Sequence, residues 1–223
     1  MFSNYCVIFD MDGVLADTGP IHFESWVKMA AEIGMEFTRE MFEETFGQQS
    51  PTITRKLVGP EVDEGLVEKW GNLKEQYYRE MIREKLTPLP GVLRIIKELK
   101  SRGFKLGIGS SGPPENVELL LTQLKIKSYF DVIITAAEVK NGKPNPNVFL
   151  KIAATLNILP KNCLVIEDAP VGIEAAKRAG MISIALTTTH KKEELHGASL
   201  VVKDLTEINL SDIINLFKWN TKI

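Results

Sequence analysis

Short hydrophobic runs rich in valine and isoleucine recur along the chain and are typical of buried β-strands. They lie at residues 5–9, 104–108, 131–134, 163–166, 182–186 and 200–202. Stretches with the hydrophobic spacing of amphipathic helices separate the later runs, at residues 91–103, 115–126, 145–158 and 169–180. Strands that alternate with helices are typical of βαβ units. The pattern therefore predicts an α/β fold with a doubly wound, mainly parallel (Rossmann-like) sheet and helices on both of its faces.

The segment from residue 18 to residue 87 breaks this alternation. Helical stretches follow one another there without a convincing strand, at residues 22–34, 38–47 and 62–86. A helical insertion after the first strand is the simplest explanation, and the prolines Pro88 and Pro90 suit a stiff return to the sheet. We therefore expect an α/β catalytic core formed by residues 1–17 and 88–223, and a helical cap formed by residues 18–87.

Composition narrows the class of protein. With 223 residues, 44% of them hydrophobic and 25% charged, the chain has the composition of an ordinary globular protein. A formal net charge of −2 provides no broad positive field, so we expect neither nucleic acid nor a membrane as a partner. No hydrophobic run approaches the roughly 18 residues of a membrane span, and the first residues lack a signal-peptide pattern. A cytoplasmic location is the resulting expectation.

Polar side chains follow four of the predicted strands, at the point where each strand ends. They are, in chain order, Asp10, Asp12, Ser110, Ser111, Lys143, Glu167 and Asp168. Ligands of open parallel sheets bind at the carboxyl ends of the strands, beside the point where the strand order reverses. We therefore expect these side chains to meet in one site.

The residue types at these strand ends suit phosphoryl transfer. Carboxylates from two strands are the ligands that Mg²⁺ prefers, whereas Lys143 and Ser110, with the N–H groups of residues 109–112, suit a phosphate. In that reaction Asp10 would attack phosphorus and form an aspartyl-phosphate. Asp12 would protonate the leaving oxygen and later deprotonate the attacking water.

Each of these motifs has an ordinary explanation when taken alone, as a turn, a helix cap or a solvated residue. A calcium loop is disfavoured, because its sixth and twelfth positions, counted from Asp10, hold Leu15 and Ile21 in place of glycine and an acidic residue. We interpret Asp17 as organising the turn into the cap and not as a metal ligand. The common order of the other motifs favours a single site.

In combination, the motifs "FDMDGVLADT", "GIGSSG", "KNGKPNPNVF" and "VIEDAPVGIEAAKRAGM" resemble those of the haloacid dehalogenase superfamily of phosphohydrolases in order and spacing. The resemblance covers nearly the whole chain and points to the branch of β-phosphoglucomutase and small-metabolite phosphatases. It implies a nucleophile, Asp10, and an acid/base, Asp12, with phosphate bound by Ser110, Ser111 and Lys143. It also implies Mg²⁺ held by Asp10, the Asp12 carbonyl, Glu167 and Asp168, a cap that closes over the site, and a monomeric protein.

Two cap residues, His22 and Lys74, are candidate substrate contacts by the same resemblance, although a helix-surface position would also explain each. The predicted cap loop "FGQQSPT", residues 46–52, has no arginine where the mutase has one, and Gly112-Pro113 replaces a serine-lysine pair. Arg55, one helical turn further on, is a candidate substitute. A mutase must bind a second phosphate, and the loss of these cations weakens that binding.

We therefore expect a Mg²⁺-dependent phosphatase for a small phosphorylated metabolite, for which a sugar phosphate is one candidate. A β-phosphoglucomutase-type phosphomutase is the alternative. A regulatory or binding protein of the same fold stays a third possibility, but the loss of Asp10 or Asp168 that would mark it is not found. A dehalogenase in the narrow sense is disfavoured, because those relatives do not use the second aspartate or a metal.

Overall fold

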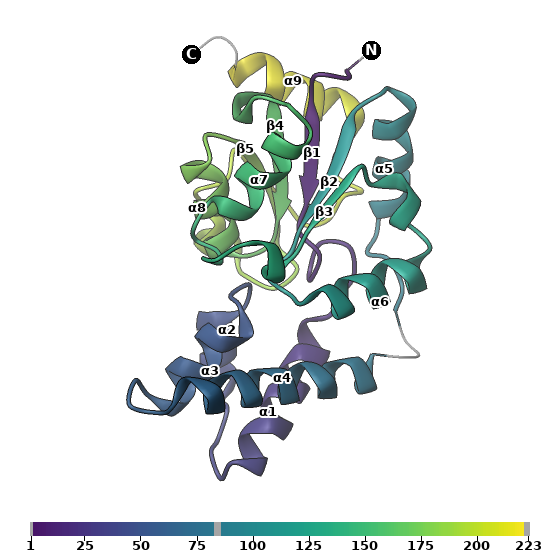
Figure 1. The fold of residues 1–223 in the computed structure, drawn as a ribbon. Coiled ribbons are helices and arrows are strands. Elements are labelled where there is room, and N and C mark those ends of the chain that lie inside the picture. Colours follow the sequence, from purple (N-terminus) through teal and green to yellow (C-terminus); the bar gives the residue numbers. More distant parts are fainter. Residues whose placement is uncertain (1, 83–85, 221–223) are drawn as a thin grey trace.

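The computed structural model describes residues 2–82 and 86–220. Within them lies a six-stranded sheet, all parallel, with the strand order β3-β2-β1-β4-β5-β6 (Figure 1). The strands are β1 (Cys6–Phe9), β2 (Lys105–Gly109), β3 (Val132–Ile134), β4 (Cys163–Glu167), β5 (Ile182–Leu186) and β6 (Leu200–Val202). Each begins and ends within one residue of its predicted range. The doubly wound parallel fold class is confirmed.

Helices cover both faces of the sheet, which explains why the strands are continuously hydrophobic. These helices are α5 (Val92–Ser101), α6 (Pro114–Leu124), α7 (Asn147–Thr155), α8 (Pro170–Arg178) and α9 (Leu210–Asn220). Val7 and Phe9 of β1 pack with α5, α6 and α9, whereas Cys6 and Ile8 point to the other face and pack with α7 and α8. Cys6 lies beside Cys163 of β4, and both are buried free thiols.

Four helices lie between β1 and α5, below the carboxyl edge of the sheet in Figure 1. They are α1 (Gly19–Glu32), α2 (Arg39–Thr45), α3 (Ser50–Val58) and α4 (Glu64–Met81). They share a hydrophobic cluster of their own around Trp26, Phe42 and Leu57. The division of the chain at residues 18 and 87 stays a prediction, and residues 1, 83–85 and 221–223 of the predicted domains lie outside the described residues.

Helix α3 is absent from the sequence prediction, which treats residues 46–52 as a loop. Pro51 belongs to this predicted loop, but the structure places Pro51 in the first turn of α3. A proline is tolerated there because the first N–H groups of a helix have no partner within the helix. Pro51 therefore marks the beginning of a helix.

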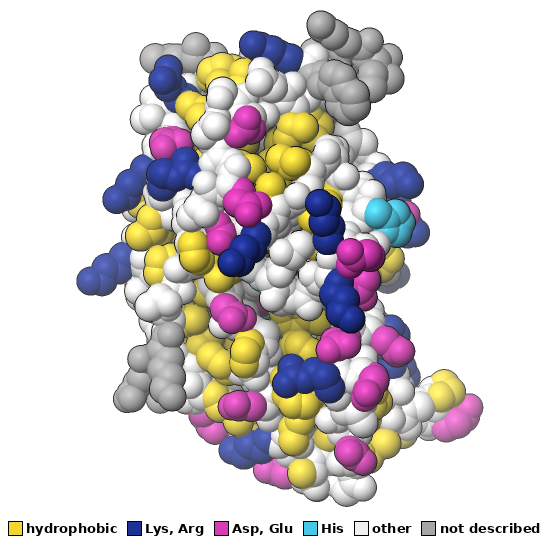
Figure 2. Space-filling view, turned by 180° about the vertical axis from the view of Figure 1, so that it is seen from behind, with side chains coloured by type: hydrophobic (Ala, Val, Ile, Leu, Met, Phe, Trp, Pro, Cys, Tyr) yellow, Lys and Arg dark blue, Asp and Glu magenta, His cyan; other side chains and the backbone are white. Residues whose placement is uncertain are grey.

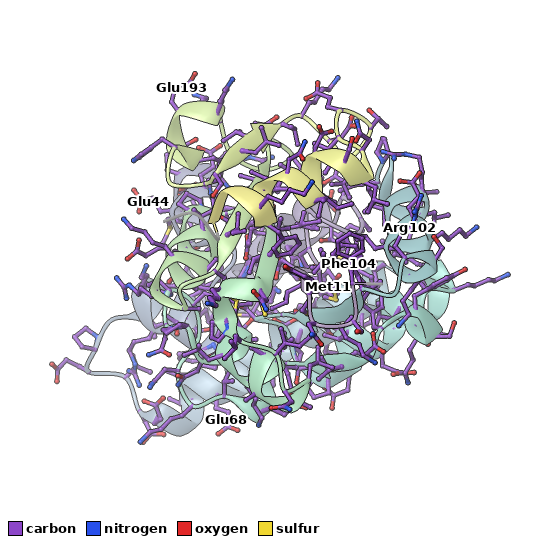
Figure 3. All side chains as sticks on the ribbon, turned by 90° about the horizontal axis from the view of Figure 1, so that it is seen from above. Met11, Glu44, Glu68, Arg102, Phe104 and Glu193 are labelled. Atoms are coloured by element: carbon purple, nitrogen blue, oxygen red, sulfur yellow. The ribbon has the colours of Figure 1, made fainter. Side chains whose placement is uncertain are left out.

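Hydrophobic side chains lie in the interior and charged side chains lie on the surface. Figure 3 shows Met11 and Phe104 directed into the interior, where they are 0% and 1% exposed, while Arg102 and Glu193 lie at the periphery. Positive and negative side chains are interspersed on the face drawn in Figure 2. None of the described helices is both long enough and apolar enough to cross a membrane.

The strand order reverses between β1 and β4, because the chain runs outward through β2 and β3 and resumes at β4 on the other side of β1. Phe9 lies opposite Ile108 of β2 and opposite Ile166 of β4. The residues that follow these positions, Asp10 and Glu167 among them, therefore leave the sheet at the same edge. This is the edge at which open α/β sheets bind ligands.

Candidate active site

Three buried carboxylates meet at the reversal of strand order. Asp10, Glu167 and Asp168 each offer an oxygen, and these oxygens all lie within 4.8 Å of one another. The N–H of Asp10 donates to the carbonyl of Ile166 at 2.9 Å, which holds the end of β1 against β4. Buried carboxylates at this separation repel one another and lose their hydration, so the cluster needs cations.

Lys143 brings a positive charge into this cluster. Its Nζ atom donates to Asp10 Oδ1 and, at 2.6 Å, to Glu167 Oε1, and its side chain is only 1% exposed. Burial disfavours the ammonium ion, but the two carboxylates outweigh burial and raise the pKa of Lys143 above its ordinary value. Lys143 is therefore charged at neutral pH.

The remaining negative charge fits a divalent cation. Burial, followed by Glu167 and Asp12, raises the pKa of Asp10 to about 7 against the opposing effect of Lys143. Burial, followed by Glu167 and Asp10, raises the pKa of Asp168 well above its ordinary value. A small cation bound by these oxygens would favour the ionised carboxylates, which are the ligands that Mg²⁺ prefers. The donor set therefore fits this metal.

Neighbouring groups hold the two acidic residues after β4 in place. Glu167 Oε2 accepts from the N–H groups of Asp168 at 2.8 Å and Ala169 at 3.0 Å, and the Thr189 hydroxyl donates to Asp168 Oδ2. A Cβ atom on Gly172 would lie 1.7 Å from Glu167 Oε1, so only glycine leaves room for that carboxylate. Such surrounding contacts orient the ligands of a metal site.

Asp12 lies apart from the carboxylate cluster and contacts the helical insertion. Its Oδ1 accepts from the Thr18 hydroxyl at 2.6 Å and from the Tyr78 hydroxyl at 3.3 Å, and lies 3.1 Å from His22 Nε2. Burial acts to raise the pKa of Asp12, but His22, Thr18 and Lys74 outweigh it and lower the pKa. Asp12 is therefore ionised in the closed site.

Both candidate substrate residues of the cap lie at this site. His22 stacks on Tyr78 with ring centroids 4.0 Å apart, and its Nδ1 lies 2.7 Å from Lys74 Nζ. A lysine ammonium can only donate, so Nδ1 must accept, and a neutral His22 carries its proton on Nε2, the atom facing Asp12. Lys74 also donates to Glu75 Oε1 at 3.0 Å.

The two serines of the second strand end have different surroundings. Ser110 is buried, and its Oγ accepts from the N–H of Gly112 at 3.0 Å. Ser111 Oγ donates to the carbonyl of Gly47 at 2.7 Å, so it joins the core to the insertion. Phosphate binding by Ser110 and Ser111 stays a prediction.

The sheet and the insertion enclose a cavity of about 40 Å³. It is lined by Asp10, Asp12, His22, Trp26, Phe42, Phe46, Gly47, Gln48, Ser50, Ile53, Lys74, Glu75, Ser111 and Gly112. This space admits a few water molecules but is far below the several hundred Å³ of ordinary ligand pockets. The insertion therefore lies over the site and leaves little space beneath it.

Comparison with known proteins identifies the family. Residues 7–186 match the family model described as "Haloacid dehalogenase-like hydrolase". The chain belongs to this family. The family assignment made from the motifs is thereby confirmed.

This hydrolase is similar to both phosphomutases and phosphatases. It is 34% identical over 214 residues to a β-phosphoglucomutase of Bacillus subtilis, covering 92% of this chain and 91% of that protein. It is also 34% identical over 179 residues to a phosphorylated carbohydrates phosphatase of Thermotoga maritima, covering 78% and 81%. A solved β-phosphoglucomutase from Clostridium difficile is 30% identical, with a TM-score of 0.90 and coverage of 98% of this chain and 99% of that one.

Arg55 of this hydrolase does not take the place of the missing cap arginine. Its guanidinium donates to the carbonyls of Gly59 at 3.2 Å, Pro60 at 3.3 Å and Val62, and pairs with Glu64. These contacts close the loop between α3 and α4, and Arg55 is not among the residues that line the cavity. The hypothesis that Arg55 substitutes for that arginine is wrong.

Sequence reasoning missed several residues that this hydrolase brings to the site. Thr18 and Tyr78 bond Asp12, Thr189 bonds Asp168, and Glu75 lines the cavity. Thr189 lies far along the chain from its partner and carries no local signal. Glu75 and Tyr78 could have been found together with Lys74, because helical spacing places all three on the face of α4 that the structure buries.

Proposed function

We propose that this hydrolase is a Mg²⁺-dependent phosphatase acting on a small phosphorylated metabolite such as a sugar phosphate. The observation that carries the proposal is the buried cluster of Asp10, Glu167 and Asp168 with Lys143 bonded to two of its members, at the reversal of strand order. A cation site beside a buried lysine suits a phosphate dianion next to a carboxylate nucleophile.

The metal would be held by Asp10, the carbonyl of Asp12, Glu167 and Asp168. When bound, Mg²⁺ supplies positive charge that reduces the repulsion between the Asp10 carboxylate and the phosphate. Lys143 adds a second cation, and Ser110 and Ser111 offer neutral donors to the phosphate oxygens.

The side chains of this hydrolase account for both chemical steps. Asp10 attacks phosphorus, the bond from phosphorus to the leaving oxygen breaks, and an aspartyl-phosphate forms. Asp12 takes up a proton as the phosphate dianion approaches, because added negative charge raises the pKa of a neighbouring carboxyl. It gives this proton to the leaving oxygen and then removes a proton from the water that hydrolyses the aspartyl-phosphate.

A substrate of sugar phosphate size enters only if the cap, residues 18–87, moves away from the core. The contacts between them include single hydrogen bonds, from Ser111 to Gly47 and, at 3.2 Å, between His190 Nε2 and the carbonyl of Glu43. Such contacts can break and re-form at each turnover. Closure excludes bulk water from the reacting groups.

Phosphomutase activity is the second candidate, because of the identity of 34% to a β-phosphoglucomutase over most of both chains. Two features rank it lower. Arg55 is occupied in the loop between α3 and α4, and Gly112-Pro113 stands where the mutase pattern has a serine and a lysine. β-Glucose 1-phosphate supplied with a bisphosphate activator is therefore expected to give inorganic phosphate, and rapid formation of glucose 6-phosphate would reverse the ranking.

The deciding experiment is phosphate release from an aryl phosphate and from a panel of sugar phosphates, with Mg²⁺ and with chelator. Asp10→Asn is expected to lower the rate by at least about a thousandfold. Asp17→Asn, which removes an exposed carboxylate from the same segment, is the matched control and should retain activity. Full activity of Asp10→Asn, or of the wild type in chelator, would contradict the mechanism. Phosphate binding without turnover would favour a binding protein.

A further inference from the structure

Two adjacent charged side chains lie on the buried face of α4. Lys74 is 2% exposed and Glu75 is 5% exposed. A buried charge is costly unless it is paired, and a hydrophobic pair of similar size would usually be at least as stable. This pair therefore calls for an explanation beyond folding.

Side chains of three residues, two of them distant in the chain, hold the carboxylate of Glu75. Its Oε1 accepts from Lys74 Nζ at 3.0 Å and from the Ser50 hydroxyl, and its Oε2 accepts from Asn116 Nδ2 at 2.6 Å. Asn116 in turn accepts from Arg79 at 2.9 Å. Burial acts to raise the pKa of Glu75, but Lys74, His22 and Ser50 outweigh it and lower the pKa. Glu75 is thus a fixed negative charge at neutral pH.

Glu75 stands between the reacting groups and the outside of the molecule. It lines the enclosed cavity that also contains Asp10 and Asp12. Together with Ser50 and Ser111 it also lines an open groove of about 330 Å³ between α3, α4, the segment that leads into α6 and a short 3-10 helix at Ala136–Glu138. Among the described residues that line this groove, the charged ones are Glu68 and Glu75, both acidic.

The carboxylate of Glu75 would interact favourably with hydroxyl groups and unfavourably with phosphate groups. A hydroxyl can donate to the carboxylate of Glu75, whereas a phosphate dianion has no proton to donate and is repelled. The two cations of α4 near Glu75 already have partners. Lys74 is paired with Glu75 and contacts His22, and Arg79 donates to Asn116. A second phosphate on the leaving group would therefore meet the carboxylate of Glu75 while both cations are held by other groups.

We propose that Glu75 is a specificity-determining residue that restricts the site to polyhydroxylated monophosphates. Its carboxylate accepts hydrogen bonds from hydroxyl groups of the leaving group and repels a second phosphate. Ser50 and Asn116 hold it in the orientation that does so. The inference rests on the proposed phosphatase function, because it concerns the leaving-group side of that same site.

The test compares β-glucose 1-phosphate with β-glucose 1,6-bisphosphate on the full chain with Mg²⁺. The wild type is expected to favour the monophosphate in kcat/KM by at least about tenfold. Glu75→Gln keeps the size of the side chain and an acceptor for Asn116 but removes the charge. It should reduce the preference by about tenfold, mainly through a lower KM for the bisphosphate. Glu80→Gln removes an exposed charge from the same helix, away from the cavity, and should leave the preference as in the wild type.

Equilibrium binding of the same two ligands to Asp10→Asn proteins, with and without Glu75→Gln, gives a measurement that needs no turnover. A loss of affinity for both ligands in parallel would show that Glu75 only supports the fold, and would overturn the inference. Equal values of kcat/KM for the bisphosphate and the monophosphate in the wild type would also overturn the inference. Binding that favours the monophosphate through Glu75, in a protein that releases no phosphate, would support the inference and overturn the phosphatase function alone.

Discussion

His22 Nε2 lies 3.1 Å from Asp12 Oδ1, so a side chain of the first inserted helix touches the carboxylate that we propose as the acid/base. His22 comes from α1 and Asp12 from the segment that follows β1. In the cap motion that we propose, opening would separate these two side chains. Cap closure would then be linked to the ionisation of Asp12.

Replacing His22 tests this link. His22→Gln removes an imidazole that lowers the pKa of Asp12, so that pKa should rise. Asp12 then stays protonated, the form that donates to the leaving oxygen, up to a higher pH, so the basic limb of the profile of kcat/KM against pH moves to higher pH. Because the substitution also removes the contact that orients Asp12, we expect the maximum of kcat/KM to fall by about tenfold. Steady-state rates of phosphate release across the pH range measure both effects.

His196→Gln is the matched control, because this histidine is exposed and its Nδ1 contacts only the nearby carbonyl of Glu193 in the described structure. Its pH profile should coincide with that of the wild type. An unshifted basic limb in His22→Gln would mean that this histidine has no influence on the proposed acid/base.

Gly172 gives a test of the proposed metal site that does not depend on turnover. Mg²⁺ at about 100 times its dissociation constant should stabilise the native state by about 2.7 kcal/mol, and so raise the melting temperature by several degrees. Gly172→Ala places a Cβ where Glu167 Oε1 now lies and should displace that carboxylate. The variant should need at least about tenfold more Mg²⁺ for the same thermal shift.

Gly71→Ala serves as the comparison, because a Cβ at this position of α4 would make ordinary contacts of 3.6 Å or longer. Its response to Mg²⁺ should match that of the wild type. If Gly172→Ala also shows the wild-type response, Glu167 does not hold the metal. If Mg²⁺ does not change the melting temperature of the wild type, the proposal of a metal site is wrong.

Asp131 is expected to make stability depend on pH in acid. Its carboxylate accepts from Lys100 Nζ at 2.7 Å and from the Leu106 N–H at 2.8 Å, and so joins α5 and β2 to the beginning of β3. Burial acts to raise the pKa of Asp131, but these bonds outweigh it and lower the pKa below its ordinary value of 3.8. Because the folded-state pKa is lowered, the stabilisation is present above the unfolded-state pKa and is lost as the pH falls through the folded-state pKa.

Asp131 is exposed, so solvent screens its charge, and Asp131→Asn should reduce the free energy of unfolding by less than about 1 kcal/mol at neutral pH. The difference from the wild type should shrink in acid, below the ordinary pKa of an aspartate. Urea denaturation at neutral and acidic pH measures it, with Asp17→Asn as an exposed control. A difference that stayed constant with pH would assign the loss to packing and not to ionisation.

The sheet could be predicted because its signal is local. Val7 and Phe9 face one layer of helices while Cys6 and Ile8 face the other, so the strand is hydrophobic at every position and stands out in the sequence. Asp10 ends that strand abruptly. A parallel sheet brings all its strand ends to one edge, so the meeting of Asp10 with Glu167 and Asp168 followed once the strands were recognised.

Other features depend on how separate elements pack, and no local pattern encodes them. Pro51 lies in a segment that the sequence predicts as a loop, whereas the structure places it in the first turn of α3. The contacts of Glu75 with Ser50 and Asn116 join α4 to the beginning of α3 and to α6, and follow from how these helices pack together. Arg55 has the charge required of a phosphate ligand, but its guanidinium is hydrogen-bonded to carbonyl groups of the loop that follows α3.

The sequence by itself determined the parallel sheet, the order of its reactive strand ends and the family, because hydrophobic runs and short motifs are properties of neighbouring residues. Tertiary structure alone decided which cap residues reach Asp12, why Gly172 must lack a side chain, and that the buried Glu75 lines the same cavity as Asp10 and Asp12. These contacts join residues far apart along the chain, and their energies depend on distances of a few ångströms that only the packed fold defines.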